Sequence, residues 1–315
     1  MVFRKETVGF MQNKCCIFIK TASLLLAVFL LLCGCSKKEE EHPRPSEIHE
    51  FVYSDGIHKY GYVDIGSCKK LLGDVYTLVI FMDDTEGCWN ETDRNGFYDK
   101  KYFPSINYLL DKAEERDIDL TIQNGKYATK SDRVTPIIYY GKVANSADNA
   151  SLSLDLLNYA AKTLGFTDAE YMDTILKKNL KTEQIAYVIA MNKPGRAYAV
   201  FDNTFDGRDS LEFVVAFSQD ESGNDDIGSS ILHELLHLFG ATDLYDIGEG
   251  YKKRYELLSE LYPNDIMMRS AVDTGELEIG YLTECLIGWS EFFPAECDCP
   301  EWWENENGSS KEVSQ

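Results

Sequence analysis

Apolar residues along the chain form two kinds of pattern, strand-like runs and helix-like repeats. The run from Tyr76 to Met82 is apolar and rich in β-branched residues, which indicates a buried strand. Between residues 104 and 116, apolar side chains recur at helical spacing behind Pro104, which predicts a helix. The same patterns predict further strands at 118–122, 135–140, 185–191, 196–201 and 211–217, and further helices at about 150–164, 168–180, 251–261 and 278–289. Strands and helices mixed in this way predict an α/β layered domain.

One leucine-rich segment, Ile231–Leu238, also carries His233, Glu234 and His237. On a helix, residues four apart share a face with Cβ atoms roughly 5–6 Å apart, so the two histidines can hold one ion. Burying these polar groups is costly unless something pairs with them, and a metal ion would do so. Zn²⁺ suits the site because it accepts nitrogen and oxygen ligands and, in enzymes, keeps a position open for water. Glu234 can reach that water as a general base.

A catalytic zinc site needs a third protein ligand, and this chain has few histidines left to supply it. The other three, His42, His49 and His58, lie near the N-terminus, so the third ligand is expected to be a carboxylate. Asp243 lies six residues past His237, with Gly240 between them. Glycine can take the left-handed conformation that ends a helix, and such a turn would bring Asp243 back to the ion.

The full pattern, His233-Glu234-x-x-His237-x-x-Gly240-x-x-Asp243, resembles that of the metzincin zinc peptidases in the variant whose third ligand is aspartate. Snapalysin-type bacterial peptidases have this variant. The continuation Asp243-Leu244-Tyr245-Asp246 is similar to that of immune-inhibitor-A-type peptidases. The resemblance implies an α+β zincin-like fold, with a mixed twisted sheet, packing helices, an active-site helix and a smaller C-terminal subdomain.

A second segment, Pro263-Asn264-Asp265-Ile266-Met267-Met268, is similar to the Met-turn, in which a methionine forms an apolar floor beneath the zinc. The resemblance gives this role to Met267, with Met268 as the alternative. The family often has a tyrosine two residues after that methionine, which assists at the oxyanion, but this chain has Arg269 there. The other nearby tyrosines are unranked candidates for that role: Tyr245, Tyr251, Tyr255 and Tyr262.

The resemblance implies a zinc-dependent endopeptidase in which Glu234 is the general base for hydrolysis of peptide bonds. By analogy, an extended protein or peptide substrate would pair with the strand formed by Arg196, Ala197, Tyr198, Ala199 and Val200. Two alternatives remain. Glu260 resembles the glutamate with which gluzincins complete their zinc site. A zincin-fold binding lipoprotein without peptidase activity would account for Arg269 at the tyrosine position.

Charge narrows the range of partners and cofactors. The formal net charge of −22 argues against binding to nucleic acid or to an anionic membrane surface. The acidic loop at 218–226, together with Asp202, Asp206 and Asp209, is a candidate Ca²⁺ site, but it lacks EF-hand spacing and a solvated loop is favoured. Asp225 or Asp226 is a candidate N-cap for the histidine-bearing helix.

The N-terminus has the pattern of a targeting segment. Lys14 and Lys20 precede an apolar run that ends in Leu32-Cys33-Gly34-Cys35, which resembles the lipobox of bacterial lipoproteins. Residues 1–34 are then a signal peptide, and lipidated Cys35 anchors the chain at the cell surface or periplasmic face; a plain N-terminal membrane anchor is the alternative. Residues 35–72 are expected to form a tether with a hairpin at 51–66, residues 73–300 the peptidase domain, and residues 301–315 a polar tail.

Five cysteines remain after the signal segment: Cys68, Cys88, Cys285, Cys297 and Cys299. An extracytoplasmic compartment allows one or two disulfides among them, although the sequence does not fix their pairing.

Overall fold

The computed structural model describes residues 48–50, 67–68, 70–126, 135–148, 153–200, 211–225, 228–245, 252–269, 274–290 and 292–294. The chain divides into two compact units, Met1–Arg44 and Pro45–Gln315, and every described element belongs to the second. The predicted signal peptide with Cys35, the hairpin at 51–66 and the polar tail lie outside the described residues. Within the described part, no helix has both the length and the apolar character needed to cross a membrane.

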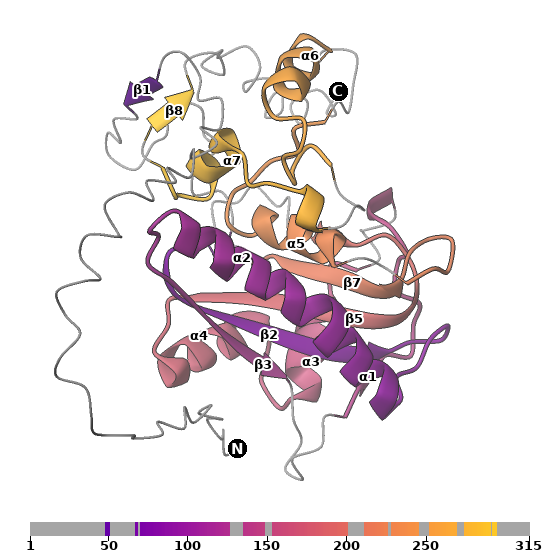
Figure 1. Ribbon diagram of the computed structural model, residues 1–315. Helices are drawn as coiled ribbons and strands as arrows, with labels where there is room; N and C mark the ends of the chain where they lie inside the picture. Colours follow the sequence, from indigo (N-terminus) through magenta and orange to yellow (C-terminus); the bar gives the residue numbers. More distant parts are fainter. Residues whose placement is uncertain are drawn as a thin grey trace, which may run out of the picture. The chain divides into compact units, whose positions relative to one another are not determined.

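A mixed six-stranded sheet forms the centre of the described unit (Figure 1). Its strands are β2 (Gly73–Asp83), β3 (Leu120–Lys126), β4 (Ile137–Ile138), β5 (Gln184–Pro194), β6 (Tyr198–Val200) and β7 (Phe213–Gln219). The strand order is β3-β2-β5-β7-β6, and β4 pairs with the carboxyl end of β2. All neighbours run parallel except β6, which is antiparallel to β7 and ends the order among the described strands.

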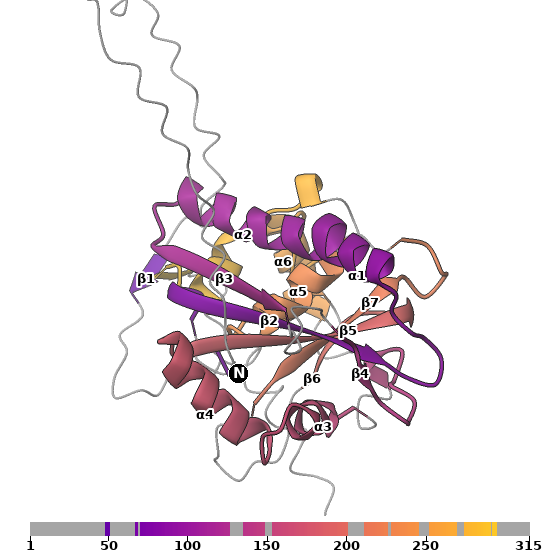
Figure 2. The same cartoon turned by 90° about the horizontal axis from the view of Figure 1, so that it is seen from below.

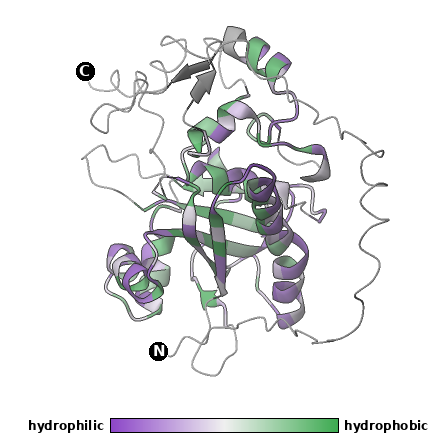
Figure 3. Cartoon of the chain, turned by 60° about the vertical axis from the view of Figure 1, so that its left-hand side comes forward, coloured by the Kyte–Doolittle hydropathy of each residue, from purple (hydrophilic) through white to green (hydrophobic). Residues whose placement is uncertain are grey.

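The central strands are apolar on both faces because helices cover the sheet on both sides. Along β5, Ala186, Val188 and Ala190 pack into one core, and the alternate residues pack into the other. The first core is closed by α2 (Phe103–Glu115) and α5 (Ser229–His237), and the second by α3 (Leu156–Thr163) and α4 (Ala169–Leu180). Figure 2 shows α2 on one side of the sheet and α3 and α4 on the other. In Figure 3, the hydrophobic colour follows the strands between these helix layers.

The remaining elements extend these layers. Helix α1 (Glu91–Phe97) continues through a π-helical turn, Tyr98–Tyr102, into α2, which has Pro104 in its first turn. After α5 come α6 (Lys252–Leu261), the 3₁₀ turn Thr274–Glu276 and α7 (Tyr281–Leu286). A separate antiparallel pair joins β1 (Ile48–Glu50) to β8 (Phe292–Pro294).

Most of the predicted elements are confirmed, including the α/β layering. The strand at 135–140 is reduced to the two residues of β4, and the helix predicted at 150–164 begins only at Leu156, after a turn. The predicted closing helix at 278–289 is only α7, because Gly280 is its extended N-cap and Gly288 takes a positive φ of 87° just beyond its end. The predicted strand at 196–201 forms β6 over three residues.

Two other expectations concern caps and cysteines. The proposed cap of α5 by Asp225 is wrong, because the N-cap is Gly228 and no side chain accepts a hydrogen bond there. Asp225 instead forms a β-bridge with Gln219. Asp226, the other candidate cap, lies outside the described residues.

Of the five cysteines, Cys297 and Cys299 lie outside the described residues. No disulfide joins the described cysteines, Cys68, Cys88 and Cys285.

Candidate metal centre

Helix α5 carries the polar motif on an otherwise buried helix. Its apolar side chains, Ile231, Leu232, Leu235 and Leu236, are all buried in the core between the sheet and the C-terminal segments. The helix ends in a Schellman turn, in which Ala241 N donates to Leu236 O at 3.1 Å and Gly240 N donates to His237 O at 2.9 Å. Gly240 has a φ of 93°, in the left-handed region that favours glycine. The predicted turn at Gly240 is therefore confirmed.

This turn brings Asp243 back against both histidines. Its Oδ1 lies 2.9 Å from His233 Nε2 and 3.4 Å from His237 Nε2. The two imidazole rings meet nearly at right angles, with centroids 5.0 Å apart. Two nitrogen donors and one carboxylate oxygen thus face a common point.

The second ring nitrogen of each histidine is held by a backbone carbonyl. His233 Nδ1 lies 2.8 Å from Ile266 O, and His237 Nδ1 lies 2.8 Å from Ala241 O. A carbonyl oxygen can only accept a hydrogen bond, so both Nδ1 atoms carry the proton. In the neutral imidazole this leaves the Nε2 lone pair for a cation, which is the usual arrangement around metal-binding histidines.

Glu234 lies beside this cluster. Its Oε2 accepts a hydrogen bond from Ala199 N at 2.8 Å and lies 3.8 Å from His237 Nε2. Donor atoms of His233, Glu234 and His237 also lie within 4.8 Å of one another, so either carboxylate could complete a three-ligand set. Asp243 fits that role better, since it is closer to both imidazoles and Glu234 already accepts from Ala199.

The charged groups of the cluster shift one another's pKa values. Burial opposes the charge on Asp243, but hydrogen bonds from His233 and His237 hold its pKa below the usual range. Burial also disfavours protonated His237, yet its bond to Asp243 and the charge of Glu234 raise its pKa to about 9. Burial raises the pKa of Glu234, and the two histidines partly offset this. Two imidazoles and an ionised carboxylate are a donor set that suits zinc, which would replace the proton of His237.

The Met-turn-like segment lies directly against the cluster. Besides the contact of Ile266 O with His233, Met267 O accepts from Leu244 N at 2.9 Å. Met267 is fully buried in the same core as the leucines of α5, and Met268 is 8% exposed. Met267 is thus the more deeply buried of the two methionines.

The structure separates the candidate tyrosines. The ring of Tyr245 stacks on His233, with centroids 6.1 Å apart, and burial followed by the charge of Asp243 raises the pKa of its phenol. Tyr255 is exposed on α6, and Tyr251 lies outside the described residues. Arg269 is exposed, with Nη1 3.4 Å from Asn264 Oδ1. Tyr262, the remaining candidate, is buried in the same core as Met267. Tyr245 is the candidate seen to stack on His233, a contact that spacing alone did not predict.

The alternative ligand Glu260 is exposed on α6, whereas Asp243 already contacts both imidazoles. This geometry favours Asp243 over Glu260 as the third donor.

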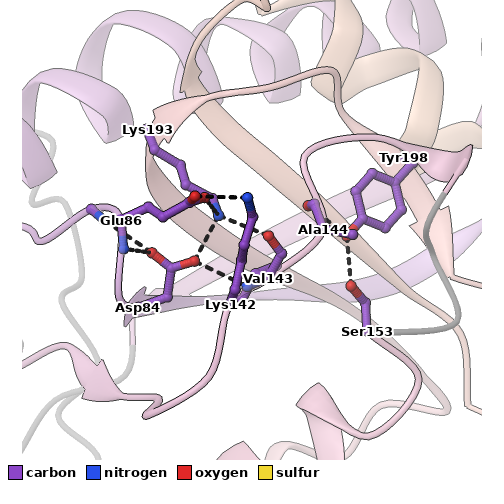
Figure 4. Close-up of polar contacts among 9 residues, drawn as sticks. Asp84, Glu86, Lys142, Val143, Ala144, Ser153, Lys193 and Tyr198 are labelled. Carbon is purple, nitrogen blue, oxygen red and sulfur yellow. Dashed lines mark hydrogen bonds and ion pairs between the residues drawn. The ribbon is translucent and has the colours of Figure 1, made fainter.

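Hydrogen bonds to the loop at 143–145 fix strand β6. Tyr198 donates from its phenol to Ala144 O at 3.0 Å and lies 2.7 Å from Ser153 Oγ (Figure 4). Arg196 N donates to Asn145 O at 2.8 Å, and the Arg196 side chain is exposed. Ala197 and Val200 are buried like Tyr198 and Ala199. The loop at 143–145 therefore sets the position of the strand whose Ala199 N–H touches Glu234.

That loop is fixed in turn by a buried ion pair, which sequence reasoning missed. Lys193 Nζ, at the end of β5, donates to Asp84 Oδ2 at 2.6 Å, to Glu86 Oε2 at 3.1 Å and to Val143 O at 2.8 Å (Figure 4). Val143 N donates back to Asp84 Oδ2 at 3.0 Å. The available signal was a lysine close to the end of a buried apolar run, two residues past Met191.

In the acidic loop at 218–226, the candidate Ca²⁺ site, the Asp220 carboxylate is occupied by hydrogen bonds. Asp220 accepts from Ser222 N, Asn224 N and Asn224 Nδ2 at 2.8, 2.9 and 3.1 Å, so the carboxylate is engaged within its own turn. The other acids of the suggested Ca²⁺ site, Asp202, Asp206 and Asp209, lie outside the described residues.

The described residues thus bring His233, His237 and Asp243 together at the C-terminal end of α5, with Glu234 and the edge of β6 beside them. No protein-family model and no curated protein matches this chain.

Proposed function

We propose that this chain is a zinc-dependent endopeptidase, with His233, His237 and Asp243 as zinc ligands and Glu234 as general base. One observation carries the proposal. Both histidine Nε2 atoms face Asp243 Oδ1, at 2.9 and 3.4 Å, while backbone carbonyls hold both Nδ1 atoms. The mixed sheet, the antiparallel edge strand and the buried Met267 segment are compatible with a zincin-like fold.

When bound, zinc supplies Lewis-acid chemistry, polarising a carbonyl and lowering the pKa of water. Glu234 moves the proton: it takes one from the attacking water and delivers it to the leaving amine. The hydrogen bond from Ala199 N holds the Glu234 carboxylate in place, with its Oε2 3.8 Å from His237 Nε2. Burial raises the pKa of Glu234, which brings its proton affinity closer to that needed at neutral pH.

The substrate would bind as an extended peptide along β6, from Arg196 to Val200. Strand addition uses a sheet edge, and among the described strands β6 ends the order, with its Ala199 N–H donating to Glu234. Peptide substrates placed there would lie next to the proposed general base.

We also propose that the protein is a lipoprotein anchored through Cys35, on the sequence pattern Leu32-Cys33-Gly34-Cys35 alone. Metabolic labelling with a fatty acid tests this, since Cys35→Ser is expected to abolish the label. Labelling that persists in that variant excludes Cys35 as the lipidated residue.

The test of function combines metal analysis with a peptide-library digest. The purified chain is expected to bind one zinc and to cleave peptides until a chelator is added. Glu234→Gln should retain zinc and lose turnover by about 10²–10⁴-fold. Asp243→Ala should lose zinc, whereas Glu260→Gln, a change at an exposed acid, should leave both unchanged. Full zinc occupancy with no cleavage of any library member would refute the peptidase.

A second function, a peptide-binding protein without catalysis, is favoured by one feature. Arg269 occupies the position where a catalytic tyrosine is expected, and its side chain is exposed. Equal peptide binding by the wild type and Glu234→Gln, with no product from either, would support this function.

A further inference from the structure

A buried carboxylate outside the ligand set, Asp265, lies behind His233. The residue is 1% exposed, and its carboxylate accepts from three donors, two backbone N–H groups and one hydroxyl. Oδ1 accepts from Met267 N at 2.7 Å and from Thr283 Oγ1 at 3.0 Å, and Oδ2 accepts from Gly280 N at 2.8 Å. A pocket lined by donors suits an ionised carboxylate rather than an amide, which would turn its own N–H bonds toward one of them.

The contact that matters for the site is the one to Met267 N. That N–H belongs to the same peptide group as the carbonyl of Ile266, and this carbonyl is the partner of His233 Nδ1 at 2.8 Å. A peptide group is planar, with N–H and C=O pointing in opposite directions. Fixing its N–H on Asp265 therefore aims its C=O at the imidazole.

The same arrangement has an electronic consequence. A carboxylate on the N–H polarises the peptide group and makes the carbonyl a stronger acceptor, since chains of hydrogen bonds strengthen one another. A stronger acceptor at Nδ1 holds the proton there and makes Nε2 a better electron-pair donor. In many metal sites a carboxylate accepts the hydrogen bond of the histidine directly, whereas here a peptide group lies between the carboxylate and the histidine.

The surroundings fit a positioning role. Ile266 N donates to Glu278 O and Glu278 N donates to Asn264 O, both at 2.9 Å, so the turn is braced on its other side. A Cβ added to Gly280 would lie 2.4 Å from Asp265 Oδ2, so a larger residue there would displace the carboxylate.

We propose that Asp265 is a positioning residue that acts through the Ile266–Met267 peptide group to fix the Nδ1–H tautomer of His233 and to strengthen its Nε2 as a zinc ligand. This inference rests on the proposed zinc site. It assigns to the Met-turn-like segment a task in ligand orientation that is separate from the packing of Met267.

The test measures zinc affinity of the full chain by competition with a chromophoric chelator. Asp265→Asn is expected to weaken zinc binding by about 10–100-fold, the usual effect of losing such an outer contact. The matched control is Asp173→Asn, another buried acid, which contacts Tyr187 and Lys177 at 3.0 and 2.9 Å and lies across the sheet from the cluster. It should leave zinc affinity within about twofold of the wild type, well short of the effect of losing an outer contact.

A second variant displaces the carboxylate without removing its charge. Gly280 has a φ of −72°, so Gly280→Ala introduces no backbone strain; its Cβ would press most closely on Asp265 Oδ2 and less closely on Tyr262 Cδ1, at 3.0 Å. It should weaken zinc binding in the same direction, whereas Gly96→Ala, where a Cβ meets nothing within 4 Å, should not. Gly280→Ala decides the question if Asp265→Asn does not fold.

Imidazole ¹⁵N chemical shifts of the zinc-loaded protein provide a readout that packing alone would not move. The wild type should show a single Nδ1–H form of His233, and Asp265→Asn a changed Nδ1 shift. If the wild type binds no zinc, both the proposed function and this inference are refuted. Wild-type zinc affinity in folded Asp265→Asn, or in Gly280→Ala if the first variant does not fold, overturns the inference alone.

Discussion

The buried ion pair behind β6 gives a quantitative stability prediction. The Lys193 side chain is 3% exposed and the Asp84 side chain is fully buried, so Lys193→Met leaves Asp84 without its cation. Removing one partner of a buried pair costs about 3–5 kcal/mol. Asp84 keeps hydrogen bonds from Glu86 N, Gly87 N and Val143 N at 2.9, 2.9 and 3.0 Å, which places the expected cost near the lower limit, about 3 kcal/mol.

Urea denaturation followed by circular dichroism measures this cost. Lys193→Met should shift the midpoint without changing the slope, because the surface exposed on unfolding is nearly the same. Adding Asp84→Asn should recover part of the loss, since the double variant no longer buries an unpaired charge. Lys142→Met is the control: the Lys142 side chain is 58% exposed and its Nζ lies 2.7 Å from Glu86 Oε1, so its loss should cost no more than about 1 kcal/mol.

The pH dependence supplies the refuting result. Burial opposes ionisation of Asp84, but Lys193 and the backbone donors lower its pKa below 3.8. A lowered pKa contributes stability above pH 3.8 that is lost as the pH falls through the folded-state pKa, so the cost of Lys193→Met should shrink in acid. A cost below about 1 kcal/mol at pH 7, or a double variant less stable than Lys193→Met, contradicts the reasoning.

Three further predictions concern the turn at Gly240, the proton on His237 and the buried carboxyl of Glu212. Gly240→Ala places a Cβ at a φ of 93° and should lower the free energy of unfolding by at least about 1–2 kcal/mol. It should also weaken zinc binding, because the same turn carries Asp243. Unchanged zinc affinity would show that the ligand set does not depend on this turn. His237 has a pKa of about 9, so it must release a proton when zinc binds at pH 7. Calorimetry in buffers of different ionisation enthalpy should detect this release, and zinc affinity should decrease as the pH is lowered. Burial raises the pKa of Glu212 from 4.5 to about 7, so it contributes stability that is complete below pH 4.5 and lost as pH rises through 7. Glu212→Gln should remove this pH dependence of the free energy of unfolding, which amounts to on the order of 3 kcal/mol between pH 4.5 and pH 8. Thermal denaturation at several pH values measures it, and a variant with the same pH dependence as the wild type would contradict the prediction.

Local patterns predicted the elements whose cause is local. The strand at 76–82 was readable because β2 is apolar on both faces, and the turn at Gly240 because only glycine takes that φ easily. Asp168 begins α4 as an N-cap with its carboxylate on Tyr171 N at 2.7 Å, within three residues of sequence. The approach of Asp243 to His237 also follows from one turn, so spacing was enough to predict it.

Contacts between distant segments were out of reach of the sequence. The hydrogen bond from Ala199 N to Glu234 depends on β6 pairing with β7, and the one from His233 Nδ1 to Ile266 O depends on a separate segment after α6. Spacing could not rank Tyr245 above the other tyrosines, because stacking on His233 is set by the tertiary fold. The Asp225 cap failed for a similar reason, since the bridge between Asp225 and Gln219 holds that residue in the loop ahead of the helix.

The crossed order of the sheet has a consequence for when activity can arise. Val75 pairs with Gln184, and Tyr187 with Phe213, so each parallel pair closes a long loop before it gains any contact, and folding by such distant pairings is slow. The proposed centre draws on β6, α5 and the turn after α6, so an unfolded or partly synthesised chain contains the motif without a working hydrolase. The proposed peptidase would therefore acquire its site only after these distant segments have come together.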